Sequence, residues 1–494
     1  MISLREWLTR NDIYLDLRLS LDASRGTLRV VALDSIPPHQ TVAKIPHSCI
    51  LSRRTSTLSK RIVSLSNLAQ DLEALSPPLH LAVHVLYELT LVSSSRWSGY
   101  FQHCPPETVE IGLLWELDGP ARRWASGTDL ERELDRIQID KRVLSRIFDS
   151  LVLPLFSSLH NIFPSSLPLP TLSTFLYSYS LVSSRSFEID NYHRLSLVPL
   201  SDAFNHLSPG ENQVEFLSGE GEGGWVCPEC GKVEECRHDR NEEREQTDDE
   251  VVEEQFCEMV TTEAPIEEGE EVFNSYGERS NARLVAEYGF RLEANEWDRI
   301  TFEEEEIEDV LRSLSVGRRQ DQTVFEKEES GDEEDQEEDH PLIATPRSPQ
   351  DTKAFYFDAD AKISGHLWST LVTSVPPPSL TKTKLREEDL SLELARIIDE
   401  LDKEEGAEDY SETHPIDETT RRALVGIARA IDILCERRLM KQCRPDRNGS
   451  ELLNLAEVET NPSVKLAIEV TAGERLLLER VRENWRSIIT ACRG

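Results

Sequence analysis

The sequence lacks a long uninterrupted apolar stretch. The longest one, residues 79–92, is broken by His84 and Glu88 and is shorter than the roughly 20 residues that a membrane-spanning helix needs. Residues 1–17 also lack the continuous apolar centre of a secretory signal, because charged side chains such as Arg5 and Asp12 interrupt them. We therefore expect a protein of the cytoplasm or nucleus with no membrane partner, in which residues 79–92 form a buried helix.

Basic residues are scarce relative to acidic ones. The chain has 54 Lys and Arg against 92 Asp and Glu, so its formal net charge at pH 7 is −38. A field of that sign repels phosphate backbones and anionic membrane surfaces within a Debye length. The sequence therefore argues against nucleic acid as the main partner and favours a protein partner of basic character.

Apolar residues are also fewer than a fully compact chain would have. They make up 38% of the 494 residues, and we find no internal repeat of fixed period. Acidic residues crowd positions 303–339, and Pro341, Pro346 and Pro349 follow them. This composition is typical of a solvated, disordered linker, although the same charge could attract basic substrates. We place an acidic disordered linker at residues 293–350.

Hydrophobic periodicity predicts an α+β protein. Short alternating runs with turn residues indicate strands in residues 13–52, and strand patterns return between residues 194 and 275. Apolar residues recur at helical spacing from residue 58 to about 180 and again in the last 140 residues. We therefore predict a strand-rich part (1–57), a helical insert (58–180), a second strand-rich part (181–292), the linker, and an α-helical domain (351–494). We expect a monomer, and two helix faces should form the core of the last domain: Leu424, Ile427, Ala428, Ile431 and Leu434, and Leu477, Leu478, Val481, Trp485 and Ile488.

Two short segments form the strongest functional pattern. They are residues 198–206 (VPLSDAFNH) and residues 269–277 (GEEVFNSYG), which continue to residues 288–290 (YGF). Each segment alone is more often an ordinary turn or strand end. In this order, with the helical insert upstream and residues 184–187 (SRSF) just ahead, they resemble the SET-domain methyltransferases. The resemblance is to the Rubisco large-subunit lysine methyltransferase type and its fungal ribosomal-protein lysine methyltransferase relatives.

This resemblance implies both a fold and an activity. The fold would be a SET β-fold interrupted by a helical insert and followed by an α-helical substrate-binding domain. The activity would be methylation, from S-adenosyl-L-methionine, of a lysine in an intracellular basic protein such as a ribosomal protein, a translation factor or a histone. Two alternatives stay open. The acceptor could be a histidine, or the SET fold could be catalytically idle and serve as a protein-binding module.

The resemblance also assigns a cofactor site. Asn205 would hold the amino-acid end of the cofactor through its side-chain amide, and His206 would meet the adenine through its backbone. Arg25 and Gly26 would form the first cofactor loop. Arg185 would lie beside the cofactor carboxylate, which its planar donor fork suits, although an ordinary salt bridge is the alternative.

The acceptor site would be a narrow channel lined by Arg185, Asp202, Tyr276 and Tyr288. Only a neutral amine can attack a methyl group, and a free lysine has a pKa of about 10.4. Desolvation in the channel and a nearby positive sulfonium both disfavour the charged amine. Tyr276 would then orient the amine through a hydrogen bond, and whether it also acts as a base is left open.

A cysteine cluster predicts a structural zinc ion. Nine cysteines are present, and Cys227, Cys230 and Cys236 lie close together with His238. Two cysteines at C-x₂-C spacing, a third cysteine and a histidine supply the four ligands that tetrahedral zinc prefers, with no open position for catalysis. Cys257 could replace His238 as the fourth ligand. The alternative is a set of reduced thiols in a surface loop.

Overall fold

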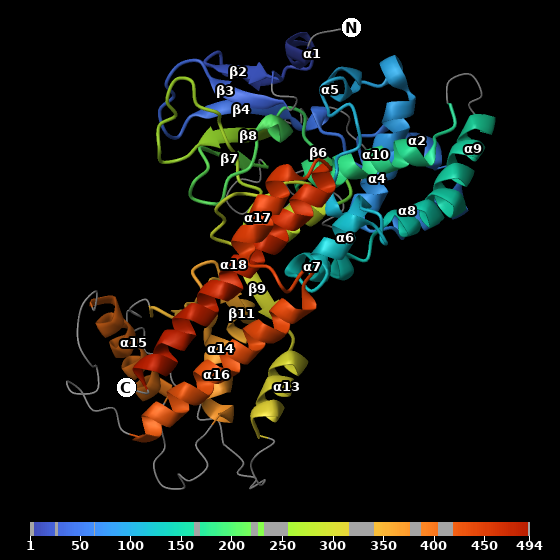
Figure 1. Cartoon of the computed structure of the whole chain (residues 1–494). Helices are drawn as coiled ribbons and strands as arrows, with labels where there is room; N and C mark the ends of the chain where they lie inside the picture. Colours follow the sequence, from blue (N-terminus) through green and yellow to red (C-terminus); the bar gives the residue numbers. More distant parts are fainter. Residues whose placement is uncertain are drawn as a thin grey trace, which may run out of the picture. The chain divides into compact units, whose positions relative to one another are not determined.

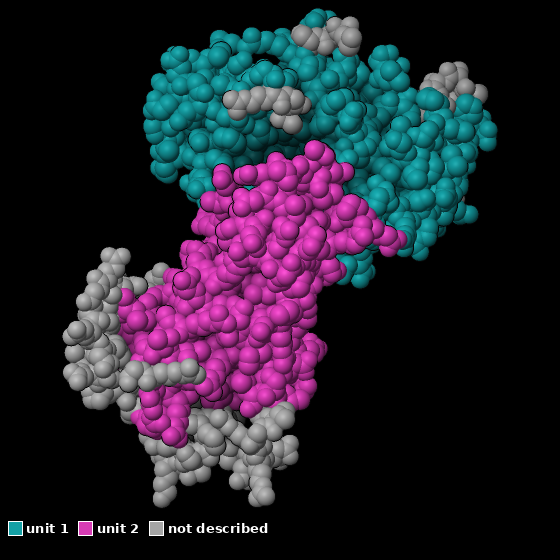
Figure 2. Space-filling model, viewed as in Figure 1, with its two compact units in different colours: residues 1–117, 134–279, 283–292 teal, residues 118–133, 280–282, 293–494 magenta. Residues whose placement is uncertain are grey.

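The protein is described from a computed structural model, which covers residues 4–24, 28–63, 65–162, 168–218, 226–231, 255–315, 340–375, 387–403 and 418–492. The chain divides into two compact units (Figure 2). Unit 1 comprises Met1–Leu117, Leu134–Arg279 and Arg283–Leu292, and unit 2 comprises Asp118–Glu133, Ser280–Ala282 and Glu293–Gly494. No helix in the described ranges is both long and apolar enough to span a membrane.

Unit 1 is built on short antiparallel strands (Figure 1). Its largest sheet has the order β1-β4-β8-β7, and Ile45 of β4 pairs with Cys257 of β8. Buried residues alternate with half-buried ones along β8, as expected of a strand with one face on a core. Two hairpins, β2-β3 and β5-β6, complete the strands. Their bounds are β1 (Tyr14–Leu15), β2 (Leu19–Asp22), β3 (Arg29–Ala32), β4 (Thr41–Pro46), β5 (Ser186–Glu188), β6 (Leu195–Leu197), β7 (Val214–Leu217) and β8 (Phe256–Thr261).

Helices of unit 1 fill most of the chain between β4 and β5, as predicted for the helical insert. The central helix α4 begins at Pro77, a position where proline costs no hydrogen bond, and buries every residue from Leu79 to Glu88. It packs against α10, which begins at a capping box between Thr171 and Thr174. The helices are α1 (Leu4–Arg10), α2 (Thr57–Ile62), α3 (Ser66–Glu73), α4 (Pro77–Thr90), α5 (Ser98–Phe101), α8 (Lys141–Ile147), α9 (Leu153–Ile162), α10 (Leu172–Arg185) and α12 (Asn281–Glu287), of which α12 belongs to unit 1 from Arg283 on.

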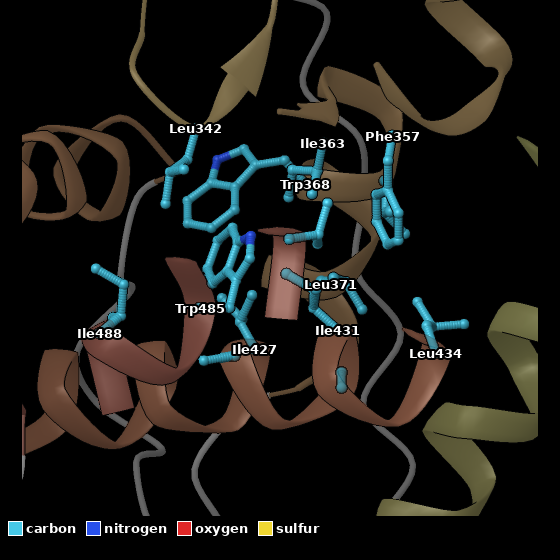
Figure 3. Close-up of a cluster of buried hydrophobic side chains, with 14 of the residues drawn as sticks. Leu342, Phe357, Ile363, Trp368, Leu371, Ile427, Ile431, Leu434, Trp485 and Ile488 are labelled. Carbon is cyan, nitrogen blue, oxygen red and sulfur yellow. The ribbon is translucent and has the colours of Figure 1, made fainter. Parts of the chain in front are cut away.

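Unit 2 combines long helices with a small sheet of order β10-β12-β11-β9. Figure 3 shows its core, in which Trp368 and Trp485 lie with ring centroids 6.4 Å apart. Both predicted helix faces, on α16 and α18, are buried in this core. The elements are α6 (Pro120–Ala125), the start of α7 (Asp129–Ile137, whose residues from Leu134 on belong to unit 1), β9 (Arg299–Phe302), α13 (Glu304–Ser315), β10 (Ile343–Ala344), β11 (Phe355–Asp358), β12 (Ile363–Ser364), α14 (Gly365–Ser374), α15 (Glu387–Lys403), α16 (Glu418–Lys441), α17 (Gly449–Val458) and α18 (Pro462–Ala491).

Three predicted boundaries differ from the structure. The predicted linker, residues 293–350, contains β9, α13 and β10, because apolar residues such as Phe302, Ile307 and Val310 are buried in the unit 2 core between the acidic ones. Residues 316–339 lie outside the described ranges. The predicted α-helical domain, residues 351–494, also carries strands β11 and β12. Residues 118–133 were placed in the helical insert but belong to unit 2.

Candidate active site

The two sequence motifs are hydrogen-bonded to each other. His206 and Asn274 form a parallel bridge, outside any named strand. The backbone N–H of Asn274 donates to the Asn205 carbonyl at 2.8 Å, and the N–H of Leu207 donates to the Asn274 carbonyl at 3.0 Å. Segments that are remote in sequence therefore meet at one place, which is where the resemblance predicts the site.

Tyr276 lies directly after this bridge. Its backbone N–H donates to Nδ1 of His206 at 3.0 Å, and its hydroxyl donates to the carbonyl of Phe204 at 3.3 Å. Gly277 follows with a φ of 88°, a backbone conformation that glycine adopts readily and other residues rarely do. The chain therefore turns sharply just after the tyrosine, and two hydrogen bonds to the 204–206 segment fix the position of its side chain.

The Tyr276 ring belongs to an aromatic cluster. It stacks on His206, with ring centroids 4.8 Å apart, and on Tyr288 at 5.2 Å, and Phe290 meets it edge-on. Burial raises the pKa of the Tyr276 hydroxyl well above its ordinary value of 10.0. Burial, together with the charge of Arg279, lowers the pKa of His206 to about 4. At neutral pH the phenol is therefore protonated and the imidazole is neutral.

Arg185 and Asp202 form an ion pair at the C-terminal end of α10. One terminal nitrogen of the guanidinium donates to the Asp202 carboxylate at 3.0 Å and to its backbone carbonyl at 3.1 Å. The Tyr100 hydroxyl donates to the same carboxylate oxygen at 2.9 Å. The Nε of Arg185 is buried and has no hydrogen-bond partner in the described part of the chain. The salt bridge that was the alternative for Arg185 is thus present, and the buried Nε remains available to a ligand.

A cavity of roughly 690 Å³ opens beside these residues, entirely within unit 1. Of the predicted site residues, Arg185, Asp202, Tyr276 and Tyr288 line it. Its volume is in the range usual for small-molecule sites. The structure therefore brings together the four residues that were predicted to form the acceptor channel.

Asn205 and His206 adjoin this cavity but are not among the residues that line it. The side-chain amide of Asn205 donates to the Glu271 carboxylate at 2.7 Å, and Glu271 also pairs with Arg29 at 3.2 Å. The predicted contact of the Asn205 amide with the cofactor therefore stays a prediction, and in this structure that amide binds a carboxylate.

Several predicted residues lie outside the described ranges, namely Arg25, Gly26, Cys236 and His238. Of the predicted zinc ligands, Cys227 is buried and Cys230 is half-buried. Cys257, the alternative ligand, is buried on β8, and burial raises the pKa of its thiol. The zinc knuckle stays a prediction.

Sequence reasoning missed two residues of the site. Tyr100 shares the Asp202 carboxylate from 102 positions away, and nothing local in the sequence marks that contact. Asn274 lines the cavity, is 2% exposed, and has an Nδ2 without a hydrogen-bond partner among the described residues. A signal for Asn274 did exist, since it lies in the 269–277 motif two positions before Tyr276.

The fold is the α+β fold of the SET domain, as predicted. The structure of Rubisco LSMT bound to AdoMet matches with a TM-score of 0.54 and 15% sequence identity, over 99% of this chain and 92% of that chain. The crystal structure of the SET domain of LSMT bound to lysine and AdoHcy matches with the same TM-score and identity, over 98% of this chain and 90% of that chain. Likeness at this level of identity establishes the fold.

Sequence comparison points to particular relatives. The chain is 24% identical over 338 residues to ribosomal lysine N-methyltransferase 3 of Saccharomyces cerevisiae, covering 55% of this chain and 58% of that protein. It is 25% identical over 283 residues to N-lysine methyltransferase setd6 of Xenopus laevis, covering 55% of this chain and 52% of that protein. The chain thus spans between half and three fifths of these relatives. No protein-family model matches. The resemblance to SET-domain lysine methyltransferases is confirmed.

Proposed function

We propose that this chain is a protein-lysine N-methyltransferase that uses S-adenosyl-L-methionine. One observation carries the proposal. Tyr276, whose hydroxyl is protonated, lines a cavity together with Arg185, Asp202 and Tyr288. The similarity in sequence to lysine N-methyltransferases and the similarity in fold to Rubisco LSMT support the same chemistry.

The residues of the cavity fit the proposed cofactor. Its amino-acid end carries a carboxylate, and two buried donors at the cavity, Nε of Arg185 and Nδ2 of Asn274, have no hydrogen-bond partner in the described residues. Buried donors of this kind cost free energy unless a ligand satisfies them. When bound, S-adenosyl-L-methionine supplies a methyl group on a positively charged sulfonium. Arg185 and Asn274 would hold it, next to the Asn205-His206 segment.

Tyr276 would orient the acceptor amine. Its proton is donated to the Phe204 carbonyl, so the lone pairs of the hydroxyl oxygen stay available to accept an N–H of the incoming amine. An amine bound in this way points its own lone pair away from the phenol, which is the alignment that methyl transfer needs. Because burial raises the pKa of Tyr276, the phenol is protonated at neutral pH and does not serve as the base. Desolvation in the cavity would lower the pKa of the lysine ammonium, so that it gives its proton to water and the neutral amine then attacks.

The proposed substrate is a protein of basic character. Glu188 and Glu215 are exposed carboxylates that line the cavity, and the rings of Phe187 and Phe216 lie beside them with centroids 4.5 Å apart. Carboxylates next to an apolar surface suit a lysine flanked by other cations. The similarity to a ribosomal lysine N-methyltransferase makes a ribosomal protein of the cytoplasm or nucleus the first substrate to test.

The proposal is tested by incubating the full chain with S-adenosyl-L-methionine that carries a labelled methyl group and with a cell extract. Labelled proteins are then identified and the modified residue is mapped. We expect label on a lysine of a basic protein, and loss of the label with the Tyr276→Phe variant. Label on histidine would contradict the lysine assignment. Cofactor binding without any labelling would favour the idle binding module.

A further inference from the structure

A second cluster of titratable side chains lies in unit 1, away from the residues that line the cavity. His47, Asp190 and His193 are each more than nine-tenths buried, and one ligand-type atom from each lies within 4.8 Å of the other two. His47 begins the short 3₁₀ turn after β4. Asp190 and His193 come from the loop that joins β5 to β6, at Asp-x₂-His spacing. Two parts of the chain thus bring two imidazoles and a carboxylate together.

Asp190 carries a buried charge without a permanent cation. Its Oδ1 accepts the backbone N–H groups of Tyr192 and His193, which fixes the carboxylate and leaves Oδ2 facing the imidazoles. Nδ1 of His193 lies 2.8 Å from Oδ2, and Nδ1 of His47 lies 3.9 Å from it. Within the described residues, Asp190 forms ion pairs only with these two histidines. A buried carboxylate without a lasting positive partner is costly.

One ring nitrogen of His47, Nδ1, accepts no hydrogen bond in the described part of the chain, although the side chain of Gln255 lies near the ring. Its Nε2 lies 2.9 Å from the Ser218 carbonyl, and because a carbonyl only accepts, Nε2 carries the proton of the neutral imidazole. Nδ1 is therefore left with its lone pair. That atom is buried and has no hydrogen-bond partner among the described residues. A lone pair 3.9 Å from a buried carboxylate oxygen is unfavourable for both groups unless a cation lies between them.

We propose that His47, Asp190 and His193 bind a divalent transition-metal ion of the zinc type. Imidazole nitrogens and a carboxylate oxygen are common ligands for such ions. A histidine ligand usually donates its other ring N–H to a carbonyl or a carboxylate, and the His47–Ser218 contact provides this arrangement. The ion would neutralise Asp190 and occupy the free lone pair of His47. A fourth position would be left to a water molecule or to another part of the chain.

A metal ion at this site would stabilise the two ends of the loop that carries Cys227 and Cys230. Ser218, which precedes the loop, accepts from the His47 ring, and the carbonyl of Gln255, which follows it, accepts the His47 backbone N–H at 2.8 Å. The described piece of the loop, residues 226–231, also adjoins the cluster, because Arg54 donates to the Pro228 carbonyl and lies over the ring of Tyr192. This metal site is distinct from the predicted cysteine knuckle and shares no ligand with it.

The test uses the full chain in a Cys227→Ser, Cys230→Ser background, which removes the knuckle as a source of bound metal. Metal is stripped with a chelator, and Zn²⁺ is titrated back in competition with an indicator. We expect one Zn²⁺ ion per chain, and at least roughly 100-fold weaker binding after His47→Gln, since loss of even an outer-shell partner costs 10- to 100-fold. His39→Gln, at an exposed histidine of the same unit, is the matched control and should bind as before.

The visible spectrum of bound Co²⁺ gives a second measurement, which does not require the His47→Gln variant to fold. Loaded into the same background, Co²⁺ held by two imidazoles and a carboxylate should show weak visible bands without thiolate charge transfer. The proposal is overturned if the background protein binds no stoichiometric metal, if His47→Gln binds as tightly as its parent, or if charge transfer from the remaining thiols dominates the spectrum. If His47→Gln fails to fold, Asp190→Asn replaces it in the same titration.

Discussion

Tyr276 donates its backbone N–H to Nδ1 of His206 at 3.0 Å and stacks on the same imidazole with ring centroids 4.8 Å apart. The contact joins two motifs that are 70 residues apart in sequence. It places the histidine proton on Nε2, and the lowered pKa of His206, about 4, keeps the ring neutral at physiological pH. The His206 ring therefore supports the tyrosine as a neutral acceptor and a flat stacking surface.

The hydroxyl of Tyr276 should be required for turnover. Tyr276→Phe keeps the ring and its stacking and deletes the group that is proposed to orient the amine. We expect kcat for methyl transfer to fall by roughly 10²-fold or more, the scale on which loss of a positioned acid–base or hydrogen-bonding group acts. The melting temperature and the cofactor dissociation constant should change little, because the deleted hydrogen bond to Phe204 is long, at 3.3 Å.

Tyr288→Phe is the matched control for that experiment. Tyr288 stacks on Tyr276 and lines the same cavity, so its hydroxyl should affect KM or the number of methyl groups transferred more than kcat. If Tyr276→Phe keeps a near-normal kcat on the true substrate, the Tyr276 hydroxyl does not orient the amine. Equal losses of kcat in both variants would show that the orienting role does not belong to the Tyr276 hydroxyl alone.

Asn274 should bind a ligand rather than stabilise the fold. Its buried Nδ2 has no partner in the described residues, so Asn274→Leu removes an unsatisfied donor and should leave the free energy of unfolding unchanged or raise it by up to about 1 kcal/mol. The same change should raise the cofactor dissociation constant or the substrate KM roughly tenfold, measured by calorimetry and steady-state kinetics. Unchanged values of both constants would contradict the assignment.

Asn212 provides the contrast for Asn274. It also lines the cavity, but its amide donates to the Val214 carbonyl at 2.9 Å and its oxygen accepts the Gly210 N–H at 3.0 Å. Asn212→Leu should therefore lower the free energy of unfolding by about 1–3 kcal/mol, because it leaves two backbone groups without their partners.

The sequence predicted the site better than it predicted the boundaries around it. Residues 198–206 and 269–277 each carry several polar residues in a fixed order, and their joint occurrence identified the SET fold. The Asp202–Tyr100 and Asn205–Glu271 contacts could not be predicted, because each joins residues more than 60 positions apart and depends on how the chain folds. The order of elements is encoded locally, whereas side-chain partners are decided by packing.

The sequence of α13 has the apolar periodicity of a buried helix, although its acidic composition is typical of disorder. Ile307, Val310, Leu311 and Leu314 recur at helical spacing on one face, and all of them pack in or against the unit 2 core. The surrounding glutamates led to a prediction of disorder for the whole acidic stretch. Average charge is therefore a weaker guide than periodicity wherever apolar residues keep a regular spacing.

Truncating this helix face should destabilise unit 2. Ile307 is 2% exposed, so Ile307→Ala should lower the free energy of unfolding by roughly 2–4 kcal/mol through lost burial and the cavity left behind. Glu305→Ala, at an exposed position of the same helix, should change it by less than about 0.5 kcal/mol. Equal, small effects of both changes in urea unfolding would restore the linker interpretation for residues 304–315.

A buried ion network in unit 2 should depend on Arg438. Its guanidinium binds Glu474 at 2.9 Å and also binds Asp129, whose pKa burial raises to about 6 against the opposing charge of Arg438. Arg438→Met removes the cation that Asp129 and Glu474 share and leaves Asp129 only its longer ion pair with Arg132, at 3.7 Å, so the free energy of unfolding at pH 7 should fall by roughly 3–5 kcal/mol.

The pH dependence of that loss identifies its cause. At pH 5 the Asp129 carboxylate, whose pKa Arg438 no longer holds down, can take up a proton in the folded state, so the deficit of Arg438→Met should shrink. Arg429→Met, at an exposed position of the same helix, should change stability little at either pH. A deficit that is the same at pH 5 and pH 7 would point to lost packing rather than to unpaired charge.

Unit 1 should lose stability as the pH falls below 6.5. Burial lowers the pKa of His84 well below its ordinary value, and it lowers that of His206 to about 4. Below pH 6.5 the unfolded chain takes up protons at these residues while the folded chain does not, so protonation favours unfolding. Each residue should then remove up to about 1.4 kcal/mol per pH unit, until the pH reaches its folded pKa. Urea unfolding of unit 1, followed between pH 7.5 and pH 5, measures this slope. His84→Leu removes one of the titrating histidines of unit 1 and should reduce the slope by about one proton, and an unchanged slope would show that His84 is protonated in the folded protein.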